Sequence, residues 1–188
     1  MWAFLGSDVL FFGTLIAAFL INRGKGIGPH EEIFNIPVTS ISTFVLLMSS
    51  VAMVLALAAI QHDDLKGLRI WLGVTALLGS VFIGFQMFEF REFALEGLTP
   101  RTNIFGTTFL TMTGFHGAHV TIGVVWLVSL IIASYKGHVT QARSLDIEIM
   151  GLYWHFVDIV WIVIFGVVYL VGAFGAEEHV ASAISASG

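Results

Sequence analysis

The chain has 188 residues, of which 57% are hydrophobic and only 11% are charged, and its mean hydropathy is +0.92. Because an average soluble domain is about 25% charged, this composition excludes a soluble domain and indicates an integral membrane protein. Cysteine is absent, which excludes a disulfide framework, a thiolate metal site and a cysteine nucleophile. The net charge is −5 without a block of like charges, so nothing indicates a nucleic-acid partner or a polybasic lipid anchor.

Five apolar runs are each long enough to cross a hydrocarbon core, which needs about 20 apolar residues. They predict transmembrane helices at residues 2–21, 37–60, 68–95, 105–135 and 147–174. The predicted fold is therefore all-α, a bundle of five transmembrane helices within residues 1–175 that is followed by a short polar tail at 176–188. The 8 Lys and Arg residues divide equally between the two sides of the membrane, so charge bias does not predict the topology.

Asp8 stands about two turns into the first run, with no basic residue near it in the sequence. A carboxyl that can exchange protons inside a membrane segment is by default a candidate for function. The alternative is an aspartate at the start of a helix, near the headgroups and stabilised by the helix dipole. The residues alone leave both interpretations open.

Glu89 falls toward the end of the third run and Arg91 follows it at the predicted interface. We interpret them as interfacial charges that form local pairs, with contacts to a lipid headgroup or to a partner protein as a further role.

Two polar pairs lie in the last two runs. His116 and His119 are three residues apart, as are His155 and Asp158, so each pair shares a helix face. The two helices are predicted to be antiparallel neighbours, in which the pairs differ in depth by only about 4.5 Å. Three imidazoles and a carboxylate could hold zinc or iron. We favour a structural polar seam without a metal, because a second carboxylate is lacking and bulky aromatic residues crowd the neighbourhood.

Four segments, taken together, resemble subunit III of the haem-copper respiratory oxidases, which comprise cytochrome c oxidases and quinol oxidases. The matching residues are Gly6-Ser7-Asp8-Val9-Leu10-Phe11-Phe12, Gln86 with Glu89, Thr113-Gly114-Phe115-His116-Gly117-Ala118-His119-Val120, and Tyr153-Trp154-His155-Phe156-Val157-Asp158 with Val160-Trp161. The chain resembles the five-helix bacterial type, since it lacks the first two helices of seven-helix members. It also carries Asp8 where the family usually has a glutamate, and Phe90 where tyrosine is common.

The resemblance implies a subunit without haem or copper of its own, packed against catalytic subunit I together with subunit II and other oxidase subunits. It further implies bound phospholipid, faster proton delivery to the catalytic subunit, and a multi-pass location in a bacterial plasma membrane with a cytoplasmic N-terminus. The expected function is that of the non-redox subunit III of a proton-pumping terminal oxidase in aerobic respiration. Cytochrome c is the expected electron donor, with quinol as the alternative. A stand-alone membrane metalloenzyme that uses the His/Asp set is a further alternative.

Overall fold

The computed structural model describes residues 1–22, 36–95, 104–141 and 144–167. Within these ranges the chain is helical and contains no strand. The helices are α1 (Trp2–Asn22), α2 (Ile36–Gln61), α3 (Leu65–Leu95), α4 (Ile104–Tyr135) and α5 (Ser144–Phe165). The predicted fold class is therefore confirmed. The predicted polar tail at 176–188 and the last part of the fifth predicted helix lie outside the described residues.

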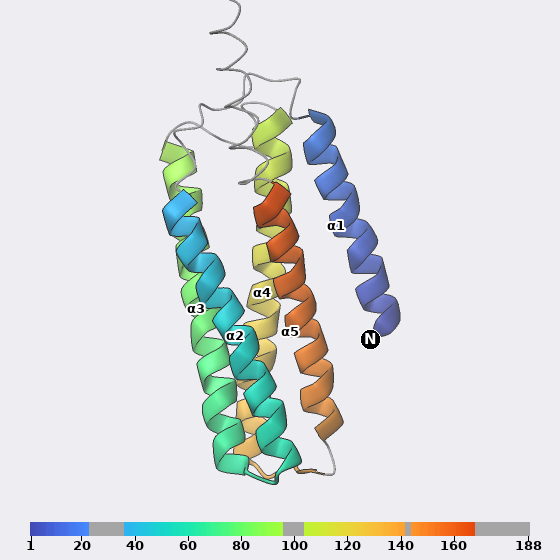
Figure 1. Cartoon of the computed structure of the whole chain (residues 1–188), viewed down its shortest axis with the longest axis vertical. Helices are drawn as coiled ribbons and strands as arrows, with labels where there is room; N and C mark the ends of the chain where they lie inside the picture. The colour runs from blue at the N-terminus through green and yellow to red at the C-terminus, as the bar shows by residue number, and fades with distance from the viewer. Residues whose placement is uncertain (23–35, 96–103, 142–143, 168–188) are drawn as a thin grey trace, which may run out of the picture.

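Helices α2 to α5 pack into one antiparallel bundle, and α1 lies along one side of it (Figure 1). α2 packs on α3 and α5, α3 packs on α4, and α4 packs on α5. α1 contacts α4 and, less extensively, α5. The polar groups of α4 and α5 are thus covered by α2 and α3 on one side and by α1 on the other.

Each helix is long and apolar enough to cross a membrane. Large apolar side chains also cover the outer surface of the bundle, for example Trp2, Leu10, Leu77 and Val125. A soluble protein rarely exposes an apolar surface of this extent. The exposed apolar surface therefore agrees with a bundle that is surrounded by lipid or by other membrane subunits.

Trp154 of α5 fills the centre of the bundle and is fully buried. Two glycines make room for its ring. A Cβ atom on Gly79 of α3 would lie 2.7 Å from Cη2 of the indole, and a Cβ atom on Gly123 of α4 would lie 2.7 Å from Cζ3. The indole Nε1 donates a hydrogen bond of 2.9 Å to Ser49 Oγ of α2. One side chain therefore fixes the spacing of four helices.

Hydrogen bonds cap and connect the helices at the end of the bundle opposite the C-terminus of α1. Asp64 Oδ1 accepts hydrogen bonds from the backbone N–H groups of Lys66 and Gly67, at 3.1 and 3.0 Å. This N-cap explains why α3 begins at Leu65 rather than at the predicted residue 68. Arg69 donates to Ser134 Oγ and to the Ser134 carbonyl, both at 2.9 Å. These bonds connect the second turn of α3 to the last turn of α4.

Candidate functional site

Asp8 of α1 lies opposite His119 of α4. Asp8 Oδ2 is 3.4 Å from His119 Nε2, and the two side chains are 13% and 17% exposed. The other ring nitrogen, Nδ1, lies 2.7 Å from the carbonyl oxygen of Phe115 on the preceding turn of α4. The carboxyl that the sequence places alone in an apolar helix therefore has an ionisable partner from another helix.

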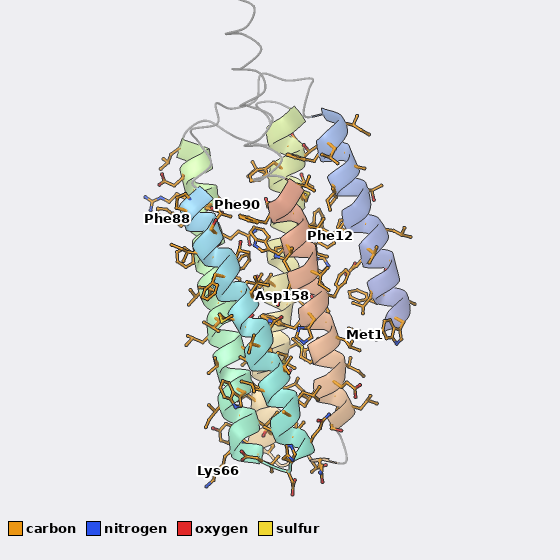
Figure 2. All side chains as sticks on the ribbon, viewed as in Figure 1. Met1, Phe12, Lys66, Phe88, Phe90 and Asp158 are labelled. Atoms are coloured by element: carbon orange, nitrogen blue, oxygen red, sulfur yellow. The ribbon has the colours of Figure 1, made fainter. Side chains whose placement is uncertain are left out.

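Aromatic rings pack around this pair. Phe12 meets the His119 ring edge-on at a centroid distance of 5.3 Å, and Phe11 meets Phe115 edge-on at 5.0 Å. Figure 2 shows Phe12 on the side of α1 that faces the bundle. The hydroxyl of Tyr153 on α5 donates a hydrogen bond of 2.9 Å to the His119 carbonyl. The pair is thus enclosed by three helices in a largely apolar setting.

His155 and Asp158 of α5 meet at Ser50 of α2. The Ser50 hydroxyl donates to Asp158 Oδ2 and lies 2.9 Å from His155 Nδ1. Ser50 Oγ therefore lies within hydrogen-bond distance of both the carboxyl and the imidazole. Asp158 is buried, and Figure 2 shows it inside the bundle on α5. The buried carboxyl and its neighbouring imidazole are therefore joined through a serine of a third helix.

His116 of α4 lies apart from both polar groups. Its ring stacks on Trp161 at a centroid distance of 4.8 Å and meets the edge of Phe82 at 5.8 Å. The side chain is fully buried, and neither ring nitrogen has a hydrogen-bond partner among the described residues. The structure thus distributes the four predicted seam residues over three separate places in the bundle.

Glu89 of α3 is buried within the bundle, and its Oε1 accepts a hydrogen bond from Thr39 of α2. Gln86, one turn earlier, donates a 2.6 Å hydrogen bond to the carbonyl of Thr113 on α4. Arg91, in contrast, is exposed on the last turns of α3. Glu89 therefore has an intramolecular partner, while Arg91 is accessible to a second molecule.

Sequence reasoning missed the contribution of α2. Its hydroxyl groups contact Glu89 of α3 and the polar groups of Trp154, His155 and Asp158 of α5. Thr43 Oγ1 accepts a 3.0 Å hydrogen bond from Trp161 Nε1, beside the bonds of Thr39, Ser49 and Ser50. The signal was present, because spacings of four and seven residues place Thr39, Thr43 and Ser50 on one helix face.

A metal centre needs several ligands close together. Among the residues that the structure describes, no group of three or more His, Asp or Glu side chains is placed to hold a metal ion. The His155–Asp158 pair faces α2, whereas His119 faces α1.

Comparisons with known proteins agree with the helix pattern and the motifs. A family profile described as Cytochrome c oxidase subunit III matches residues 1–173. The chain is 38% identical to Cytochrome c oxidase subunit 3 of a Bacillus species (strain PS3) over 176 residues, which are 93% of this chain and 85% of the relative. It is 40% identical to Quinol oxidase subunit 3 of Bacillus spizizenii over 176 residues, 93% of this chain and 86% of the relative. The Probable quinol oxidase subunit 3 of Staphylococcus aureus is 35% identical over 174 residues, 91% of this chain and 87% of the relative.

The profile match includes all four motifs, and the relatives are matched over more than nine tenths of the chain. The names of these relatives divide between cytochrome c oxidase and quinol oxidase. The chain is a bacterial membrane protein that belongs to the cytochrome c oxidase subunit III family and is a subunit III of a terminal oxidase.

Proposed function

We propose that this chain is a non-catalytic subunit that supports the haem-copper catalytic subunit I, with subunit II and further subunits completing the complex. The observation that carries the proposal is the family match over residues 1–173. Its polar side chains support it as well, since Asp8, Asp158 and Glu89 each contact a group of a neighbouring helix. The redox centres then belong to the partner subunits, and this chain supplies a stable helical surface and proton-exchanging side chains.

The non-catalytic role is tested by removing the chain. Haem and copper are measured in the oxidase purified with and without it. We expect the metal content per catalytic subunit to be unchanged and the activity to decay faster during turnover. A loss of haem or copper that follows the loss of this chain would contradict the proposal.

We propose cytochrome c as the electron donor, with quinol as the alternative that the 40% identical quinol oxidase relative favours. Donor binding depends on other subunits, so the test uses the whole complex. Oxygen consumption is compared with reduced cytochrome c and with a quinol as the only donor. Turnover with quinol alone would assign the complex to the quinol oxidases.

We propose that Asp8 exchanges protons with the side of the membrane from which the catalytic subunit takes them up. Its side chain is 13% exposed and lies 3.4 Å from the imidazole of His119, and this position beside a second ionisable group supports the proposal. Asp8→Asn is expected to leave assembly intact and to slow turnover most at alkaline pH, where free protons are scarce. Thr14→Val is the matched control, because the Thr14 hydroxyl bonds only to carbonyls of α1. Equal turnover of Asp8→Asn and the control at every pH would contradict the role.

We propose that His116, His119, His155 and Asp158, the residues of the predicted polar seam, have a structural role and stabilise helix packing at three separate places in the bundle. We further propose that Glu89 and Arg91 border a site for phospholipid or a partner subunit. A groove of about 500 Å³ between α2 and α3 supports the second part. Its walls are apolar, as an acyl chain requires, and they are formed by Val38, Val81, Gly84, Phe85 and Phe88. Lipids that remain bound to the purified complex are identified by mass spectrometry. Arg91→Ala should lose a lipid that Lys66→Ala keeps.

We also propose a cytoplasmic N-terminus. Single cysteines in an otherwise cysteine-free chain make this testable with a thiol reagent that does not cross membranes. A cysteine placed at Met1 should be protected in intact cells, and labelling from outside would reverse the orientation.

A further inference from the structure

His155 of α5 uses only one of its two ring nitrogens inside the bundle. Nδ1 lies 2.9 Å from Ser50 Oγ of α2. Nε2 has no hydrogen-bond partner among the described residues, and it is not one of the enclosed polar atoms that lack a partner. The side chain is half-buried, in contrast to that of His116, which is fully buried. Nε2 therefore lies at the outer surface of the bundle, where α5 runs beside α2 (Figure 1).

The depth of His155 makes contact between this nitrogen and lipid unfavourable. His155 lies eleven residues after Ser144, the first residue of α5, or about 16 Å along the helix axis. It is thus near the middle of a hydrocarbon core that is about 30 Å thick. Each ring nitrogen of a histidine donates or accepts a hydrogen bond in every protonation state. Acyl chains offer neither a donor nor an acceptor, so Nε2 needs a polar group from protein or water.

The surface around His155 is apolar, which favours protein over water as the source of that group. Leu152 and Ile159 lie three residues before and four residues after the histidine, on the same face of α5, and are 37% and 59% exposed. Leu47 and Val54 lie three residues before and four residues after the contact serine of α2, and they are exposed as well. Apolar residues at spacings of three and four around one polar position are typical of a seam between packed helices. In such a seam the polar residue fixes the register and the choice of partner.

We propose that the docking face formed by Leu47, Val54, Leu152, His155 and Ile159 receives a transmembrane helix of another subunit of the complex, and that this helix supplies a hydrogen-bonding side chain to His155 Nε2. The partner is an apolar helix with a hydroxyl, amide or carboxyl group at the depth of His155. A lipid would cover the apolar side chains but leave the nitrogen unpaired. The inference rests on the proposed function, because it takes the chain to be part of a complex, and it adds which face of the chain makes the contact.

A photo-activated crosslinking residue in place of Ile159 tests what occupies the docking face. Native membranes that contain the whole complex are irradiated, and the products are identified by mass spectrometry. We expect a crosslink to a transmembrane segment of another subunit that carries a hydroxyl, amide or carboxyl side chain within one turn of the crosslinked residue. Adducts with phospholipid only, a crosslink between two copies of this chain, or a crosslinked helix without such a side chain would each overturn the proposal.

Two variants of His155 test the hydrogen bond itself and serve as controls for each other. The side-chain amide of asparagine takes the place of Nδ1, and that of the longer glutamine takes the place of Nε2. His155→Asn therefore keeps a polar group beside Ser50 and loses the outer one, whereas His155→Gln does the reverse. When the purified complex is diluted in detergent, about 2- to 10-fold more of the chain should dissociate in His155→Asn than in His155→Gln. Equal dissociation of the two variants, or more of it in His155→Gln, would overturn the hydrogen bond to a partner.

The docking face and the proposed function fail in different ways. If the chain is purified together with the haem-copper subunit while the crosslinking residue at Ile159 gives only lipid adducts, the docking face is wrong and the proposed function stands. If the crosslink joins a transmembrane helix of a complex that contains no haem, the docking face stands and the proposed function is wrong.

Discussion

Gly123→Ala tests the packing at the centre of the bundle. The new Cβ atom would lie 2.7 and 2.9 Å from Cζ3 and Cε3 of Trp154, and 3.2 Å from Cε1 of Tyr153. The indole has little room to retreat, because α3 passes its other side at Gly79, where a Cβ atom would lie 2.7 Å from Cη2. Its Nε1 is also fixed by the bond to Ser49. The added methyl group therefore forces helices apart or the indole out of its rotamer.

The expected cost follows from two opposing terms. Overpacking a buried site costs about 1–3 kcal/mol, and contacts below 3 Å with a trapped ring place Gly123→Ala toward the upper end. Alanine offsets about 1 kcal/mol of this, because glycine is the poorer helix former. The net destabilisation is thus about 1–2 kcal/mol, or a 5- to 30-fold larger unfolded fraction.

The assay is thermal release of this chain from the purified complex, compared with Gly73→Ala in α3, where a Cβ atom would meet nothing within 4 Å. Gly73→Ala should be as stable as the unchanged chain or slightly more so. Adding Trp154→Phe to Gly123→Ala should recover part of the loss, so the two changes should be less than additive. Equal stability of Gly123→Ala and Gly73→Ala would refute the reasoning.

Three further changes test the polar contacts by the same thermal assay. Ser50→Ala removes the donor to buried Asp158 and should cost about 1–3 kcal/mol, because the carboxyl loses its partner; Ser50→Thr, which keeps the hydroxyl, should cost less. Arg69→Lys replaces the two hydrogen bonds from the guanidinium to Ser134 by those of a single ammonium, and it should lower the stability of the chain by about 1 kcal/mol. An unchanged thermal transition would show that the contact between Arg69 and Ser134 does not contribute to stability. Asp64→Ala should cost about 1 kcal/mol through the lost N-cap, and Asp64→Asn, which can still cap, should restore most of it.

The sequence was sufficient to predict the helices and the family. Apolar runs long enough to cross a bilayer give a strong signal, and five of them correspond to α1–α5. The four motifs indicated the family, and the profile match over residues 1–173 confirms it. The start of α3 was placed too late, because the capping role of Asp64 was not recognised as a helix signal.

The partners of the polar side chains could not be predicted from the spacing along single helices. Spacing shows that His116 and His119 share a face, but a turn of three residues still separates them by about 60° around a helix of 3.6 residues per turn. That rotation is enough to direct His116 toward Trp161 and His119 toward Asp8. Which helix covers each face depends on the arrangement of the whole bundle. The same arrangement places Thr39 of α2 beside Glu89.

The most direct test of the account is purification of the chain from membranes of its native host by a tag on the chain itself, in mild detergent, followed by a haem spectrum of the product. We predict that a haem-copper subunit is recovered with it in equal amounts and that the spectrum shows haem reducible by the oxidase's donor. Recovery of the chain without any haem-containing partner, or with a metal ion bound to the isolated polypeptide, would contradict the account.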